Sequence, residues 1–179
     1  MSSSTTAAGI VLAAGAGTRY GMPKVLAHEG EWLRRAVAAL SKGGCVDVVV
    51  ILGAAVIDVP PPARCVVAAD WADGMSASLR AGLAAIDGFD LAVLSLVDTP
   101  DVGADVIRRV LAAASPSGLA RAFYDGKPGH PVVVAREHWP GLVASLHGDG
   151  GARSFLAGRD DVAVVECGDL ATGTDVDKR

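Results

Sequence analysis

Three glycines and two cations follow a short apolar stretch near the start of the sequence, at a spacing suited to an anion-binding loop. In chain order they are Gly15, Gly17, Arg19, Gly21 and Lys24. Glycine reaches backbone angles closed to other residues and lets main-chain N–H groups approach an anion. Arginine adds a planar fork for phosphate oxygens, and lysine adds a mobile point charge. The segment therefore predicts a loop that binds phosphate.

The spacing of these residues excludes two familiar phosphate loops. A dinucleotide-binding loop has the pattern G-x-G-x-x-G, whereas the pattern from Gly15 is G-x-G-x-x-x-G, which is one residue longer. A Walker loop places its lysine directly after a glycine, whereas Lys24 follows Pro23. The loop must therefore hold its ligand in another way.

A carboxylate stands at the end of the most apolar predicted strand. Asp98 follows residues 91–97, and Thr99-Pro100 ends that strand. In an open α/β sheet ligands collect at the carboxyl ends of the strands, where an aspartate would bind Mg²⁺ together with phosphate oxygens. Asp98 is thus a predicted metal ligand, and Asp101 is predicted to cap the helix that follows.

Two more carboxylates lie near the end of the sequence. Asp175 and Asp177 are separated by one residue, so they point the same way if the segment is extended. Terminal residues are often solvated instead, and the sequence leaves both possibilities open. If only one of the pair is a ligand, we favour Asp177.

The elements that position these residues follow from the apolar pattern. Short apolar runs predict strands over 8–13, 46–52, 65–68 and 91–96. Helical periodicity appears between them, at residues 32–40, 75–86 and 102–111. This alternation predicts an α/β fold with right-handed crossovers and a mostly parallel sheet.

The alternation changes after residue 118. Residues 120–124 and 131–135 predict a hairpin that forms one wall of a substrate site. Short helices near 139–146 and 152–157 and a last strand at 162–166 complete the predicted elements.

Composition limits the partners. The 179 residues predict one domain over 1–179, with a disordered tail at 1–6, and a core of aliphatic residues because 51% are hydrophobic and only 4% aromatic. The net charge of −4 without a basic stripe predicts no nucleic-acid partner, and no apolar run is long enough to predict a membrane partner. Three scattered cysteines are predicted to be reduced and mostly buried in strands, in a cytoplasmic protein: Cys45, Cys65 and Cys167.

The first loop resembles the signature L-A-A-G-x-G-x-R-x-G-x-P-K of MobA-like nucleotidyltransferases at every specified position from Leu12 to Lys24. Asp98-Thr99-Pro100 and Asp175-Val176-Asp177 are similar to the D-x-P and late D-x-D segments of that family. The resemblance implies a single-domain Rossmann-like three-layer sandwich of the nucleotide-diphospho-sugar transferase type. It also implies Mg²⁺, with Mn²⁺ as an alternative, bound by Asp98 and Asp177.

Further segments resemble one branch of this family, the molybdenum cofactor cytidylyltransferases. Residues 71–83 are similar to W-x-x-G-M-x-x-S-L-x-x-G-L, residues 129–131 to G-H-P, and residues 148–153 to G-D-x-G-A-R. The first segment places Gly74 at a helix start whose free N–H groups, with the Ser76 and Ser78 hydroxyls, are expected to face an anion or base. The other two are expected to contact the acceptor.

The resemblance implies an enzyme of EC class 2.7.7 that moves a nucleoside monophosphate, most simply CMP from CTP, onto a phosphorylated acceptor such as molybdopterin, releasing pyrophosphate. Arg19, Lys24 and Asp98 are the predicted catalytic residues. The predicted nucleotide-binding residues are Leu12, Ala13, Ala14, Gly15, Gly17, Arg19, Lys24, Gly74, Ser78 and Asp98. The predicted acceptor-binding residues are His130, Asp149 and Arg153, with Asp149 able to act by orienting Arg153.

Other functions stay open. The acceptor could be a sugar 1-phosphate or a phospho-acid, and a molybdoenzyme could be a protein partner. From another class, the glycine loop could hold NAD or FAD in a small oxidoreductase. The loop spacing speaks against this, as does Leu52-Gly53-Ala54 at the place where such folds carry a ribose-binding acid.

Overall fold

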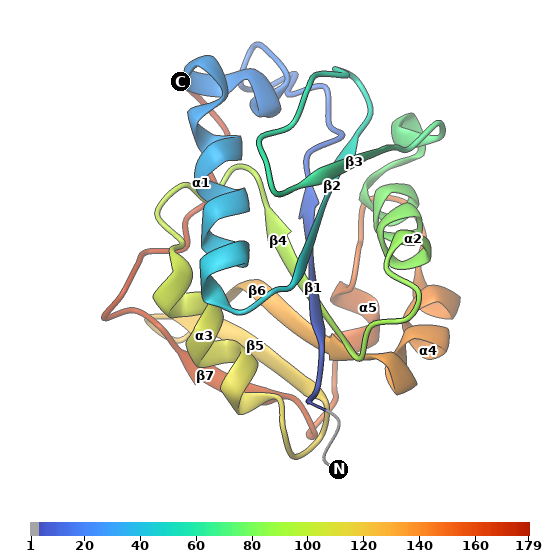
Figure 1. The fold of residues 1–179 in the computed structure, drawn as a ribbon, viewed down its shortest axis with the longest axis vertical. Helices are drawn as coiled ribbons and strands as arrows, with labels where there is room; N and C mark the ends of the chain where they lie inside the picture. The colour runs from blue at the N-terminus through green and yellow to red at the C-terminus, as the bar shows by residue number, and fades with distance from the viewer. Residues whose placement is uncertain (1–3) are drawn as a thin grey trace.

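The computed structural model describes residues 4–179 and contains a seven-stranded sheet (Figure 1). The strand order is β3-β2-β1-β4-β6-β5-β7. The strands are β1 (Ala7–Leu12), β2 (Asp47–Leu52), β3 (Arg64–Val67), β4 (Leu91–Leu96), β5 (Leu119–Tyr124), β6 (Lys127–Ala135) and β7 (Ala163–Glu166). Only β6 pairs antiparallel with its neighbours, so the predicted mostly parallel sheet is confirmed.

Helices cover both faces of the sheet (Figure 1), as the predicted three-layer α/β class requires. One face carries α1 (Ala27–Gly43) and α3 (Ala104–Ala113). The other carries α2 (Met75–Ala85), α4 (Trp139–Ser145) and α5 (Arg153–Leu156). Three short 3₁₀ turns complete the elements: η1 (Lys24–Leu26), η2 (Trp71–Asp73) and η3 (Arg136–His138).

Alternation along the central strands divides the core into two apolar clusters. Val48 and Val50 of β2 pack with α1 and α3, while Val49 and Ile51 pack with α2. Successive side chains of a strand point to opposite faces, so a strand buried on both faces must be apolar throughout. This explains the continuous valine and isoleucine run of β2.

The carboxyl ends of β1 and β4 lie side by side, because these strands pair parallel with Leu12 opposite Leu96. The first loop leaves β1 at this edge, and Asp98 follows β4. The sheet order therefore brings together the two motifs that carry the predicted chemistry.

Two sequence predictions need correction. Cys45 and Cys167 are buried, but neither lies within a strand, and Cys65 is exposed because β3 is an edge strand. Within the predicted disordered tail, residues 1–3 lie outside the described part of the chain. Thr6 is fixed, since its N–H and its hydroxyl both donate to Asp90.

Across the described residues, none of the helices combines the length and the apolar character needed to span a bilayer.

Candidate functional site

The loop after β1 is held open for a ligand by its own backbone. Gly17 and Gly21 have φ values of 64° and 96°, in the left-handed region that favours glycine. A Cβ on Gly17 would overlap the Met22 carbonyl, which folds back against it. Gly15, by contrast, has no positive φ, so the expectation of a special backbone angle there is wrong.

Several main-chain donors in this loop are available. Gly21 N–H donates to Gly17 O at 2.8 Å, and Ala13 N–H donates to Ile51 O at 3.1 Å. Within residues 4–179, the N–H groups of residues 14–20 donate no hydrogen bond. Free backbone amides at a glycine loop form a concavity suited to anions.

Two adjoining cavities lie beside this loop, of about 460 and 300 Å³. Both are lined by Leu12, Gly15, Met75 and Asp149. The structure places every predicted nucleotide-binding residue on one or both of them: Leu12, Ala13, Ala14, Gly15, Gly17, Arg19, Lys24, Gly74, Ser78 and Asp98. The exposed Arg19 faces the larger cavity.

Lys24 joins the loop to the metal-binding motifs. Its ammonium donates to Asp98 at 2.6 Å and to Asp177 at 2.9 Å. Lys24 and Asp98 are each 16% exposed, whereas Asp177 is 51% exposed. The Lys24–Asp98 contact is thus the shielded part of the network, where charges interact most strongly.

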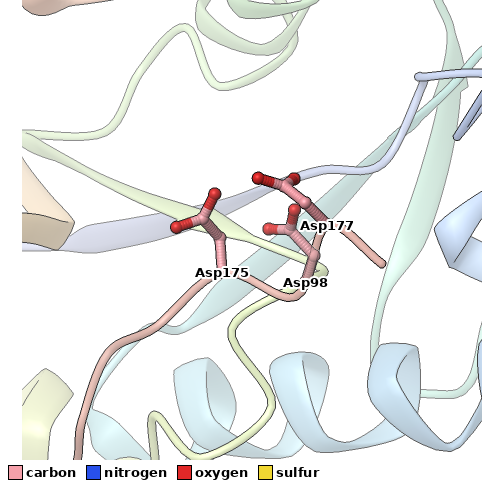
Figure 2. A group of neighbouring side chains, drawn as sticks. All are labelled: Asp98, Asp175 and Asp177. Atoms are coloured by element: carbon pink, nitrogen blue, oxygen red, sulfur yellow. The ribbon is translucent and has the colours of Figure 1, made fainter. Parts of the chain in front are cut away.

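Three carboxylates gather at this point (Figure 2). Asp98, Asp175 and Asp177 each offer an oxygen, and these oxygens lie within 4.8 Å of one another. Oxygen donors from carboxylates suit Mg²⁺ or Mn²⁺. The donor set therefore fits a hard divalent cation. The sequence offered Asp175 and Asp177 as a pair and favoured Asp177 if only one is a ligand, and the structure brings both beside Asp98.

The pKa values of these groups reflect their burial and mutual charge. Burial raises the pKa of Asp98, helped by the charges of Asp175 and Asp177, and the Lys24 hydrogen bond opposes the rise. The pKa of Asp177 is lowered, first by its hydrogen bond to Lys24. Burial lowers the pKa of Lys24, but both aspartates more than offset this, so it is raised. A second positive charge at this place would relieve the repulsion at Asp98.

The C-terminal segment reaches the site as an ordered strap, defined here as residues 172–177. Val176 N–H donates to the Asp98 carbonyl at 3.0 Å, with Asp175 and Asp177 on either side of it. The Asp101 carboxylate accepts from Thr172 N–H at 2.7 Å, from the Thr172 hydroxyl at 2.6 Å and from Gly173 N–H at 3.2 Å. Asp101 was expected to cap α3, and this expectation is wrong, because its carboxylate binds the strap.

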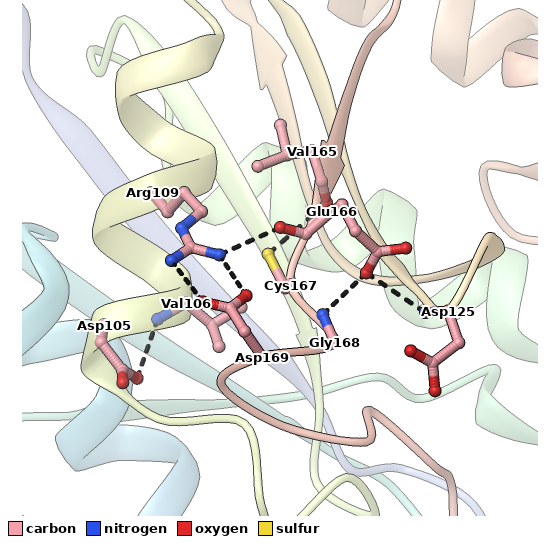
Figure 3. Close-up of polar contacts among 9 residues, drawn as sticks. All are labelled: Asp105, Val106, Arg109, Asp125, Val165, Glu166, Cys167, Gly168 and Asp169. Carbon is pink, nitrogen blue, oxygen red and sulfur yellow. Dashed lines mark hydrogen bonds and ion pairs between the residues drawn. The ribbon is translucent and has the colours of Figure 1, made fainter.

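The segment before the strap is anchored to α3 and to the β5–β6 turn (Figure 3). Arg109 of α3 donates to both carboxylate oxygens of Asp169 and to the Glu166 carbonyl. The Glu166 carboxylate accepts from the N–H groups of Asp125, Gly126 and Gly168. These contacts direct the chain from β7 toward the strap.

The start of α2 is not free to bind an anion, contrary to expectation. Asp149 accepts from Met75 N–H at 3.3 Å, and the Gly148 carbonyl accepts from Ser76 N–H at 3.0 Å. The buried Ser76 hydroxyl donates to the His147 carbonyl. Ser78 lies on the smaller of the two cavities beside the first loop. Asp149 therefore caps α2, and no contact to Arg153 supports the orienting role considered for it.

A third cavity, of about 280 Å³, lies between the β5–β6 hairpin and α5. The predicted acceptor-binding residues His130, Asp149 and Arg153 line it. Burial, and then the charge of Arg121, lowers the pKa of His130 to about 4, so its imidazole is neutral at physiological pH. Arg121 also lines this cavity and was missed, because a single arginine in an alternating strand carries no sequence signal.

Comparison with known proteins places the chain in a family. Residues 9–163 match the MobA-like NTP transferase domain. The chain is 36% identical to the nicotine blue oxidoreductase of Paenarthrobacter nicotinovorans over 185 residues, which cover 94% of this chain and 91% of that protein.

Solved structures share the fold. Rv0371c from Mycobacterium tuberculosis H37Rv superposes with a TM-score of 0.78 at 27% identity, covering 98% of this chain and 95% of that one. A complex of Rv0371c with manganese superposes with a TM-score of 0.72 at 26% identity, covering 96% and 94%. A nucleotidyl transferase from Methanothermobacter thermautotroptrophicus gives a TM-score of 0.80 at 19% identity over 98% and 93%, and this likeness concerns the fold alone.

Proposed function

Because the chain belongs to the MobA-like NTP transferase family, we propose that it transfers a nucleoside monophosphate from a nucleoside triphosphate to a phosphorylated small molecule. The observation that carries this proposal is the meeting of Lys24 with Asp98 and Asp177 beside a loop with free amides. No general base is needed, since a phosphate nucleophile is already ionised near neutral pH.

In this proposal, positively charged groups bind the phosphates and the carboxylates bind the metal ion. The loop amides and Arg19 bind the triphosphate, and Lys24 adds a positive charge from the same cavity. Asp98, Asp175 and Asp177 would hold a divalent cation, which would supply positive charge against the phosphates. Rv0371c, which shares this fold, has been solved in complex with manganese, and this supports the use of a divalent metal. We propose Mg²⁺ as the resident ion, with Mn²⁺ as its substitute.

We further propose CTP as the donor and a molybdopterin-type phosphate as the acceptor. The support is the resemblance of residues 71–83, 129–131 and 148–153 to the cytidylyltransferase branch. Three free cysteines agree with the cytoplasmic location proposed with it.

The test is pyrophosphate release from each of the four nucleoside triphosphates, with Mg²⁺ and a molybdenum-loaded pterin. We expect release with CTP, and a loss of 100-fold or more in Asp98→Asn, a cost of roughly 3 kcal/mol or more. Asp105→Asn is the matched control, because the Asp105 carboxylate accepts a hydrogen bond from Val106 N–H at the start of α3 and lines neither of the two cavities beside the first loop. Release from none of the four, or undiminished release by Asp98→Asn, would refute the proposal.

A second candidate function is oxidoreduction, favoured by the 36% identity to nicotine blue oxidoreductase. Where such folds carry a ribose-binding acid after β2, this structure has no space for a side chain, because a Cβ on Gly53 would lie 2.5 Å from Trp71 and 2.8 Å from the Ala14 carbonyl. Consumption of NADH with nicotine blue as oxidant, unaffected by Asp98→Asn, would favour this function over nucleotidyl transfer.

A further inference from the structure

The cavity between the β5–β6 hairpin and α5 holds two arginines that the nucleotide site does not use. Arg121 lies on β5 and is half-buried, and Arg153 begins α5 and is exposed. Both line this cavity, and neither lines the two cavities beside the first loop. They form a separate concentration of positive charge.

Neither guanidinium is neutralised by the protein. Arg121 donates to the Gly129 carbonyl at 3.1 Å, which orders the side chain without supplying negative charge. In the part of the chain that the structure describes, neither has a carboxylate within ion-pair distance. By contrast, Arg109 pairs with Asp169, and Arg159 pairs with Asp161. Burial, and then the positive charge of Arg153, lowers the pKa of Arg121, so the two cations lie close enough to repel each other.

Two acids, Asp149 and Asp175, line this cavity together with the arginines. Asp149 and Asp175 line both this cavity and the larger nucleotide cavity, so they stand at the boundary between the two. Asp149 is engaged by the start of α2, and Asp175 belongs to the carboxylate cluster. Both acids are therefore engaged elsewhere, and a phosphate bound by the arginines would lie in a cavity that adjoins the larger nucleotide cavity.

Half-buried His130 completes the wall near Arg121. Its imidazole carries no charge at neutral pH and can donate one hydrogen bond to an oxyanion. Two unpaired guanidiniums and one neutral ring donor suit a tetrahedral oxyanion, since an arginine fork matches two phosphate oxygens at once.

We propose that this cavity binds a phosphate group of the second substrate, and that Arg121 is the specificity-determining residue that selects a phosphorylated molecule, assisted by Arg153 and His130. That the second substrate is the nucleotidyl acceptor rests on the proposed function. The anion site itself follows from the two unpaired arginines and does not require turnover.

The test is a titration of the ¹⁵N-labelled full chain with inorganic phosphate at constant ionic strength, followed by the histidine ring signals. His130→Gln identifies the His130 signal. We expect this signal to shift with saturation, and Arg121→Gln and Arg153→Gln each to weaken phosphate binding about tenfold or more. Arg121→Lys, which keeps the charge and loses the fork, is expected to fall between them and the unmodified protein.

Arg159→Gln is the matched control, because Arg159 is paired with Asp161 and lies outside the cavity. It should change phosphate affinity less than twofold. If Arg121→Gln fails to fold, Arg153→Gln decides the question, since that exposed side chain makes no hydrogen bond in the described chain. An unmoved His130 signal, equal affinity in the arginine variants, or malonate binding as tightly as phosphate would overturn the proposal.

The outcome is distinguishable from that of the proposed function. Phosphate-dependent shifts at His130 without pyrophosphate release from any triphosphate would leave the anion site standing and remove nucleotidyl transfer. Pyrophosphate release with an unchanged KM for the acceptor in Arg121→Gln and Arg153→Gln would support nucleotidyl transfer and remove the anion site.

Discussion

Among single residues, Lys24 controls the electrostatics of the site, because one ammonium faces three clustered carboxylates. We predict that Lys24→Met lowers the free energy of unfolding by about 1–3 kcal/mol in the absence of divalent ions. Added Mg²⁺ should restore more stability to this variant than to the unmodified protein, because the ion replaces the missing positive charge. Thermal unfolding with and without Mg²⁺ measures both effects. An equal Mg²⁺ response in the two proteins would contradict this account.

Gly17 and Gly15 of the first loop are expected to have different roles, the first in stability and the second in ligand binding. We predict that Gly17→Ala destabilises the protein by about 1–3 kcal/mol, because its φ is positive and its Cβ would overlap Met22. Gly15→Ala should leave stability unchanged, since a Cβ there meets no atom within 4 Å. The same Cβ faces the nucleotide cavities, so Gly15→Ala should weaken CTP binding about tenfold. Urea unfolding and calorimetric titration distinguish the two variants, and equal stability losses would argue against the loop geometry.

At the level of elements, the strap of residues 172–177 depends on one carboxylate. We predict that Asp101→Asn weakens Mn²⁺ binding by about three- to tenfold, because the amide keeps the shape of the group but loses the charge that orders Thr172 and Gly173. Electron paramagnetic resonance of bound Mn²⁺ measures the affinity.

Asp105→Asn removes the same charge from the start of α3 without touching the strap, so its Mn²⁺ affinity should match that of the unmodified protein. Thr172→Val should reproduce a part of the Asp101→Asn defect, because it removes one of the three donors. If Mn²⁺ affinity is unchanged in both Asp101→Asn and Thr172→Val, the hydrogen bonds between Asp101 and the strap do not contribute to metal binding.

The sequence predicted the bounds of strands and helices better than it predicted the contacts between them. Strands and helices follow local periodicity, so β2, β4 and α2 were expected close to their observed bounds. The role of Asp101 was missed because its partner Thr172 lies 71 residues away. Cys65 was misplaced because an apolar run does not reveal that its strand lies at the edge of the sheet.

At the scale of the whole molecule, the parallel pairing of β1 with β4 brings the parts of the site together. β1 and β4 are 78 residues or more apart in sequence, yet their pairing places the first loop beside Asp98. The sequence predicted this meeting, because in an open α/β sheet ligands collect at the carboxyl ends of the strands, and the family resemblance agreed with it. The arginines of the hairpin cavity were beyond prediction, since their proximity depends on how β5 and α5 pack around it.

The free energy of unfolding of the whole protein should depend on pH through His130. Burial and Arg121 lower its folded pKa to about 4 from 6.5, so between these pH values the unfolded chain binds a proton that the folded chain does not. The free energy of unfolding therefore falls as the pH drops through this window, by about 2 kcal/mol between pH 7 and pH 5 from this group alone. We predict that His130→Gln loses correspondingly less stability than the unmodified protein over that interval in urea unfolding. His147→Gln, at an exposed position, controls for the substitution itself, and parallel pH profiles of His130→Gln and the unmodified protein would show that the ring is solvated rather than enclosed by the cavity wall.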